Sequence, residues 1–93
     1  MIKHIVMWKL KDAATAPHAR AQLDTCRQLV PGMLEFEVAI RTADLEARCD
    51  VVLYSVFENT AALAAYQMHP HHQKVALVVG ALRETRTTLD YQI

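Results

Sequence analysis

Residues 51–57 read VVLYSVF, and this stretch indicates how the whole chain folds. The run is nearly continuous in apolar side chains, has the length of a strand and follows the polar loop 43–50. A strand with one wet face alternates apolar and polar residues, whereas a strand that is covered on both faces does not. The stretch therefore predicts a strand with protein packed against both faces of its sheet.

Three further segments, residues 2–10, 33–42 and 82–92, show the two-residue period of a strand. In the first segment, one face carries Ile2, His4, Val6, Trp8 and Leu10. In the second segment, the apolar face carries Leu34, Phe36, Val38 and Ile40. In the third segment, one face carries Thr85, Thr87, Leu89 and Tyr91. These segments complete the expected set of strands.

Two helices are expected between the strands. Residues 16–30 repeat apolar side chains at helical spacing, with a proline in the first turn and a Pro-Gly pair after the last. Asn59 or Thr60 caps the second helix. Pro70 interrupts that helix, because a proline lacks a backbone N–H and clashes with the preceding turn. Helical spacing then resumes and stops near Gly80.

The resulting order, β-α-β-β-α-β, is that of a ferredoxin-like α+β subunit, in which helices cover one face of the sheet. The other face then carries a set of side chains that is too apolar to be left in water: Ile5, Met7, Val52, Tyr54 and Val56. A small domain buries only a limited share of its own surface. A second copy, packed sheet to sheet with two-fold symmetry, is the simplest cover, so the sequence predicts a homodimer through this face.

The composition narrows the class of protein. With 93 residues, the chain is expected to form one domain, residues 1–93. The formal net charge is zero, whereas nucleic-acid binding needs a clustered basic surface that contacts phosphates, so we do not expect a nucleic-acid partner. No apolar run approaches the roughly 20 residues of a membrane span, and the first residues do not form a signal peptide. Cys26 and Cys49 lack the spacing of a disulfide scaffold, so we expect free thiols and a cytoplasmic protein.

The chain resembles the stress-responsive A/B barrel (Dabb) domain from end to end. The segments that carry the resemblance read IKHIVMWKLKD, VPGMLEFEV, DVVLYSVFEN, ALAAYQMHPHH and TTLDYQI. The YxxHPxH block at residues 66–72 is the most specific of them, because it combines a tyrosine, a kinking proline and two histidines. The resemblance implies a dimeric α+β barrel made of two ferredoxin-like subunits.

The resemblance implies a wide range of activities. Many Dabb proteins have no known activity, a plant member, olivetolic acid cyclase, is a cofactor-independent polyketide cyclase, and the wider class includes monooxygenases and haem-degrading enzymes. By resemblance to the cyclase, His72 is the catalytic base, Tyr66 assists it and His4 lines the pocket. His69 and Pro70 are expected to be structural, with His69 bonded to nearby backbone at the kink. The resemblance to the cyclase implies neither a cofactor nor a metal.

The residue types suit that chemistry. An imidazole with a pKa near neutrality can take a proton from a carbon that lies between two carbonyls. A phenol can donate a hydrogen bond to the enolate oxygen that then develops. The apolar side chains expected to line a cavity for a small aromatic or polyketide-like ligand are Val6, Trp8, Leu10, Phe57, Leu63, Val75 and Val79.

Structural roles for the same residues stay open. His4 among apolar neighbours is also typical of a buried histidine that bonds to a backbone carbonyl or a helix side chain, and Tyr66 alone is typical of a core. A metal site formed by His69, His72 and His4 competes, although the proline spoils a simple helical pair of ligands. The sequence favours a ligand-binding Dabb protein of undefined activity, with a cofactor-free lyase or cyclase as the alternative.

Overall fold

The alternating segments form the four strands of one antiparallel sheet, in the order β2-β3-β1-β4, in a computed structural model that describes residues 1–93. The strands are β1 (Ile2–Leu10), β2 (Met33–Ile40), β3 (Val51–Phe57) and β4 (Arg83–Gln92). The helices are the short 3-10 turn η1 (Ala13–Thr15), α1 (Ala16–Asp24), α2 (Thr60–Met68) and α3 (Pro70–Leu82). The apolar run forms β3, an interior strand of the sheet, whereas the predicted cover on both of its faces is present on the helix side only.

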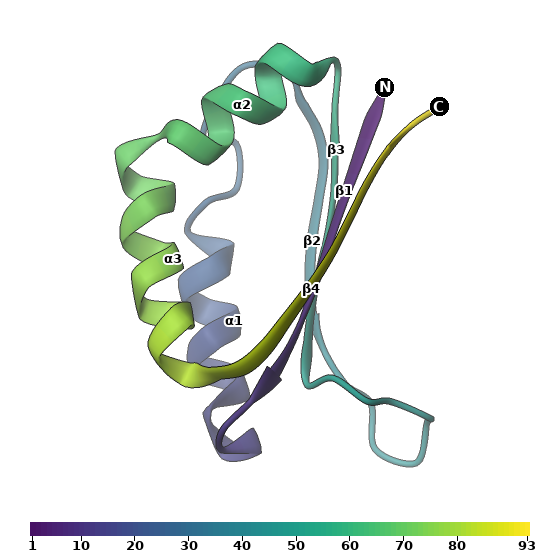
Figure 1. The fold of residues 1–93 in the computed structure, drawn as a ribbon, viewed down its shortest axis with the longest axis vertical. Coiled ribbons are helices and arrows are strands. Elements are labelled where there is room, and N and C mark those ends of the chain that lie inside the picture. The colour runs from purple at the N-terminus through teal and green to yellow at the C-terminus, as the bar shows by residue number, and fades with distance from the viewer.

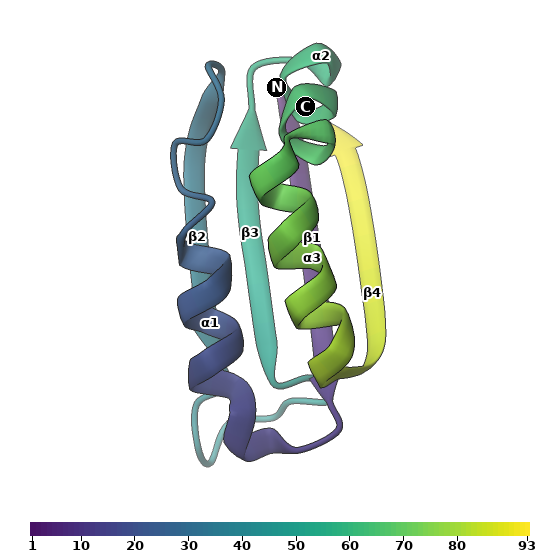
Figure 2. The ribbon, with the colours of Figure 1, turned by 90° about the vertical axis from the view of Figure 1, so that its left-hand side faces the viewer.

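All helices lie on one face of the sheet, so the molecule has two layers (Figure 1). In Figure 2, α1 and α3 lie side by side in front of the sheet, with α1 nearer β2 and α3 nearer β1. This arrangement confirms the predicted ferredoxin-like α+β fold. None of the helices combines the length and the hydropathy that a membrane crossing requires.

The first helix is shorter than the predicted range 16–30. It ends at Asp24, after which Thr25 Oγ1 donates to a carbonyl oxygen of the last turn at 2.6 Å. Gln28 then has a φ of 57°, which is incompatible with a continuing right-handed helix. Cys26 fits the helical spacing of the sequence, but its buried side chain comes from the turn that follows the helix.

Pro70 divides the second helical segment into two helices. The first of them, α2, begins after Asn59, whose side chain accepts a hydrogen bond from the Ala62 N–H at 2.9 Å. His69 has extended backbone and ends α2, and its Nδ1 accepts from the His71 N–H at 3.1 Å at the start of α3. Pro70 occupies the first turn of α3, where its missing N–H leaves no hydrogen bond unmade.

Strand β2 contains a bulge that simple alternation did not anticipate. Met33 pairs with Phe57 and Glu35 pairs with Val56, so Leu34 has no partner on β3. A bulge inserts one residue into a strand and redirects the side chains beside it. Leu34 is consequently 50% exposed, which corrects the expectation that it shares the apolar face of the strand.

The core lies between the helices and the sheet. Its largest fully buried side chains are Tyr66, Phe57, Val6, Val79, Cys26 and Ser55. The ring centroids of Phe57 and Tyr66 are 5.2 Å apart, so an aromatic contact joins β3 to α2. The centre of the core is therefore aromatic.

The opposite face of the sheet carries the apolar side chains that the sequence predicted, and Figure 1 shows no helix over it. Strands β1 and β3 contribute Ile5, Met7, Val52, Tyr54 and Val56, and β4 adds Leu89 and Tyr91. Of these, Val56 is already buried in the single chain, so it does not need a partner to cover it. Leu89 is 62% exposed and Met7 is 39% exposed in the single chain. Lys3 places Nζ 5.6 Å from the centroid of the Tyr54 ring and covers part of this face. Much of the face nevertheless remains apolar and open.

Candidate functional site

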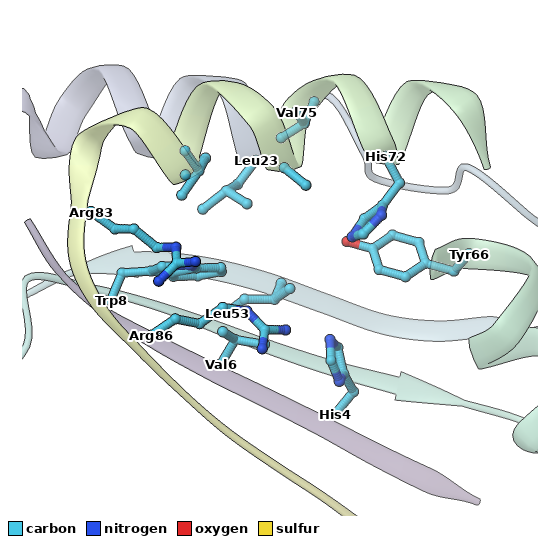
Figure 3. Close-up of a pocket in the computed structure, with 13 residues that line it drawn as sticks. His4, Val6, Trp8, Leu23, Leu53, Tyr66, His72, Val75, Arg83 and Arg86 are labelled. Carbon is cyan, nitrogen blue, oxygen red and sulfur yellow. The ribbon is translucent and has the colours of Figure 1, made fainter. Parts of the chain in front are cut away.

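A cavity of about 260 Å³ lies between α3 and the sheet, and Figure 3 shows the side chains that surround it. The larger apolar side chains of its wall are Val6, Trp8, Leu23, Leu53, Val75 and Val79. The polar side chains of its wall are His4, Tyr66, His72, Arg83 and Arg86. A mostly apolar cavity with a few convergent polar groups is typical of a small-molecule site.

Tyr66 is the most deeply buried polar residue of this wall. Its side chain is fully enclosed, and its ring centroid lies 4.6 Å from that of His72. Its hydroxyl has no hydrogen-bond partner in the protein. Burial raises the pKa of the phenol far above its ordinary value and the Cys26 thiol raises it further, so the hydroxyl stays protonated. The Tyr66 hydroxyl is therefore a protonated donor in the cavity wall, and the weakly accepting Cys26 thiol beside it does not form a hydrogen bond of full geometry with it.

His72 has a defined tautomer. Its Nδ1 lies 3.1 Å from the carbonyl oxygen of Gln67, which can only accept, so Nδ1 carries the proton. In the neutral ring, Nε2 is then the acceptor, and Figure 3 shows the ring pointing into the cavity toward the Tyr66 hydroxyl. Burial lowers the pKa of His72, the Gln67 contact opposes this effect, and His4 and Arg86 add to it. At pH 7 the ring is neutral, which is the form that a general base requires.

His4 lies in the cavity wall, where its side chain connects the first strand, β1, to the last strand, β4. Its Nδ1 bonds to a carboxylate oxygen of Asp90, which is its paired residue on β4. The carboxylate accepts, so Nδ1 carries the proton and Nε2 is the other functional atom of the ring. The ring centroids of His4 and Tyr66 are 6.4 Å apart. His4 thus bonds to a sheet carboxylate, and not to the backbone carbonyl or helix side chain of the structural reading.

Arg83 and Arg86 also line the cavity, and the sequence analysis did not single them out. Both belong to β4, where Arg86 pairs with Trp8 of β1. Asp90 was likewise missed. Polar residues occupy most of β4, so its sequence does not show which of them face the helices. Only the pairing of β4 with β1 shows that these side chains face the helix layer.

The profile of the family described as Stress responsive A/B Barrel Domain matches residues 2–93. The chain belongs to this Dabb family. A comparison with curated proteins found no match.

Solved structures share the fold of this Dabb domain at low sequence identity. A dimeric ferredoxin-like protein of unknown function from Thermobifida fusca has a TM-score of 0.87 at 15% identity, covering 99% of this chain and 90% of that chain. A dimeric ferredoxin-like protein of unknown function from Jannaschia sp. CCS1 has a TM-score of 0.76 at 26% identity, covering 99% and 98%. The hydroxynitrile lyase from Passiflora edulis has a TM-score of 0.80 at 19% identity, covering 99% and 92%. These matches confirm the fold, and two of these relatives are described as dimeric.

Three side chains that were expected to line the cavity of the Dabb domain do not do so. Leu10, Phe57 and Leu63 are buried in the core, outside the cavity wall. They face the helix layer, but helices and neighbouring rings pack directly against them. Ala76 and Gly80 of α3 line the cavity instead, and a Cβ atom added at Gly80 would meet open space. The positions of small residues on α3 therefore decide where the cavity lies.

The break at Pro70 brings the two central residues of the Dabb motif together. His69 and Pro70 are not part of the cavity wall, and they hold the junction of α2 and α3. Tyr66 precedes this junction and His72 follows it, and their rings are in contact. No group of three His, Cys, Asp or Glu side chains lies close enough together to hold a metal ion, so the competing metal reading has no geometric support.

We expect His72 to titrate below the ordinary histidine pKa of 6.5, because burial disfavours the charged ring. A pH titration of the ring resonances by NMR measures the midpoint. Arg86→Gln should raise that midpoint, because it removes a positive charge. On acidification below pH 6.5 the unfolded chain takes up the proton first, so stability falls with pH until the folded ring also titrates. A midpoint above 6.5 would contradict the buried placement of His72.

Proposed function

We propose that this Dabb domain binds a small apolar or aromatic molecule that carries an oxygen acceptor, in the cavity between α3 and the sheet. The main support for this proposal is the hydroxyl of Tyr66. Tyr66 is fully buried and lines the cavity, and its hydroxyl has no hydrogen-bond partner in the protein. Burying a hydroxyl without a hydrogen bond costs about 1–3 kcal/mol. A ligand oxygen that accepts from this hydroxyl would offset that cost.

The size of the cavity supports a small ligand. An apolar cavity of about 150 Å³ can hold benzene, whereas drug-sized ligands occupy pockets of about 300–1,000 Å³. The cavity of this chain measures about 260 Å³, which corresponds to a single substituted ring. Trp8 forms part of its wall and limits its length.

The proposal includes a homodimer in which the open sheet faces of two copies pack together. The apolar side chains on β1, β3 and β4 support this interface, because a monomer rarely leaves such a face in water. Figure 1 shows the loop between β2 and β3 projecting beyond the sheet on the same side. This loop forms one wall of an open groove of about 560 Å³, in which Leu45 lies near Met7 and Val52. A second copy would fill this groove and leave the ligand cavity on the opposite face accessible.

We also propose a cytoplasmic location. Cys26 and Cys49 are both free thiols, and unpaired cysteines are typical of reducing compartments. Burial raises the pKa of the Cys26 thiol, which supports an inert structural role for that residue.

Tyr66→Phe should raise the stability of the ligand-free protein by about 1 kcal/mol, because it removes a buried hydroxyl that has no partner. The same variant should bind oxygen-bearing aromatic ligands about tenfold more weakly. Thermal shift with a panel of small phenols, aryl ketones and aryl acids measures both effects, because a ligand stabilises the native state by mass action. Tyr91→Phe removes a hydroxyl outside the cavity and should leave ligand binding unchanged. A destabilised Tyr66→Phe protein with undiminished ligand binding would refute the proposed role.

A second function, cofactor-independent lyase or cyclase chemistry, is favoured by the way that His4, Tyr66 and His72 line one cavity. In the proposed step, Nε2 of His72 takes a proton from a carbon beside a carbonyl group. The C–H electron pair forms a carbon–carbon double bond, the π pair of the carbonyl group moves to its oxygen, and the resulting enolate oxygen accepts a hydrogen bond from Tyr66. His4, whose Nε2 is an acceptor because Asp90 holds the proton on Nδ1, is placed to accept a hydrogen bond from a hydroxyl group of the substrate. His72 then returns its proton to the carbon, or the enolate carbon attacks a second carbonyl group and the protonated His72 gives its proton to the alkoxide that forms.

Hydrogen–deuterium exchange tests this second function without knowledge of the natural substrate. In D₂O, the protein should accelerate exchange at the acidic carbon of ethyl benzoylacetate, followed by proton NMR. His72→Ala should remove at least 90% of the acceleration, because removal of a general base costs about 10²–10⁴-fold. His18→Ala, at an exposed histidine of α1, is the matched control and should exchange like wild type. Equal rates for wild type and His72→Ala would contradict proton transfer by this ring.

A further inference from the structure

The two arginines of the cavity are polar groups that the proposed chemistry does not use. Arg83 is half-buried and Arg86 is exposed, and both line the cavity. Neither guanidinium group forms an ion pair or a side-chain hydrogen bond. The carboxylates of the same strand are engaged elsewhere, since Glu84 pairs with a lysine of β1 at 3.3 Å and Asp90 pairs with His4. The cavity therefore has two cationic groups without a counter-charge.

These groups give the cavity two chemically different ends. Figure 3 shows the guanidinium group of Arg83 beside Trp8 and that of Arg86 farther along the sheet side, between Trp8 and His4, while Tyr66 and His72 lie at the end away from Trp8. Apolar side chains from the sheet and from α3 lie between the two ends. The field of Arg86 extends along the cavity, because its charge contributes to the lowered pKa of His72. A ligand that fits the whole cavity would meet cations at one end and a phenol at the other.

A guanidinium group presents its donors in a planar fork that matches the two oxygens of a carboxylate. We propose that the ligand of this cavity is a small carboxylate with a ring-sized apolar body, whose carboxylate contacts Arg83 and Arg86 and whose opposite end reaches Tyr66. The apolar walls hold the ring, and the arginines select the acid over its neutral analogues. This inference rests on the proposed function, because it places the anion in the same cavity.

Benzoate and benzamide are matched probes for this proposal, because they share the ring and differ in charge. NMR titration of the ¹⁵N-labelled protein gives the affinity of each probe and the residues that it affects. The test variant is Arg83→Gln/Arg86→Gln. The control variant, Lys11→Gln/Lys74→Gln, removes the same charge from exposed lysines outside the cavity wall.

The wild type should bind benzoate at least about tenfold more tightly than benzamide, with the largest shifts at cavity residues. The arginine variant should lose about tenfold to a hundredfold of its benzoate affinity and keep its benzamide affinity. The lysine variant should bind both probes like wild type. Raising the salt concentration should weaken benzoate binding only, because screening acts on charged pairs.

Equal affinities for the two probes, or an arginine variant that binds benzoate like wild type, would overturn the anion proposal and leave the cavity as a neutral binding site. Binding of neutral aromatic compounds without any benzoate binding would likewise overturn the anion proposal. If no aromatic probe of either charge shifts a cavity resonance, the proposed function itself fails, and this inference fails with it. Arg86→Gln alone, at an exposed position, repeats the test if the double variant does not fold.

Discussion

Leu89→Asp should turn the proposed dimer into monomers of about 10.5 kDa in light scattering at micromolar concentration. Leu89 lies on the open sheet face and is 62% exposed in the single chain, so the folded subunit tolerates the change. Packing against a second copy would bury the new carboxylate without a partner. An uncompensated buried charge costs about 3–5 kcal/mol, and two-fold symmetry applies that cost twice.

The matched control for this variant is Leu77→Asp. Leu77 is 78% exposed on α3, on the opposite side of the molecule from the open sheet face. The same substitution there should leave the dimer intact. A Leu89→Asp protein that keeps the mass of a dimer would show that the subunits associate through another surface.

Gly32→Ala should destabilise the fold by about 2–4 kcal/mol, which combines left-handed strain with overpacking. Gly32 has a φ of 87°, a conformation that costs other residues energy. A Cβ atom built on it would lie 2.9 Å from the Cβ of Ala62 and 3.3 Å from Oε2 of Glu58. The Gly32 carbonyl also accepts from the Glu58 N–H at 2.9 Å, so the backbone there has little freedom to move.

Gly80→Ala is the control for this second prediction, because it makes the same chemical change inside α3. No heavy atom lies within 4 Å of the added Cβ, and the backbone is helical. We expect a gain of about 0.5–1 kcal/mol from the better helix propensity. Urea unfolding of the two variants and the wild type gives the free energies of unfolding. Similar stabilities for both variants would show that the turn at Gly32 relaxes without strain.

Much of the fold could be predicted because it depends on local patterns. The alternation in residues 2–10 and the apolar run 51–57 were enough to define the two central strands and the apolar character of both sheet faces. The end of α1 could not be predicted, since Cys26 keeps the helical spacing and is buried from a turn. The bulge at Leu34 was missed for a similar reason, because alternation cannot show where an extra residue enters a strand.

The candidate site could be predicted only in part. The resemblance to the Dabb family pointed to Tyr66, His72 and His4, and all three line one cavity. Asp90 was missed as a partner of His4, because 86 positions separate them and only the pairing of β1 with β4 brings them together. The cavity itself depends on the small residues of α3, which a search for large apolar residues overlooks.

The pairing of β1 with β4 also bears on the order in which the protein is made. Strand β1 leaves the ribosome first and β4 last, yet β1 is interior in the finished sheet only because β4 lies beside it. Until β4 emerges, a nascent chain exposes the unpaired backbone of β1 as an edge that other chains can join. The same nascent chain lacks Asp90, Arg83 and Arg86, so this side of the cavity wall is complete only after β4 has been made.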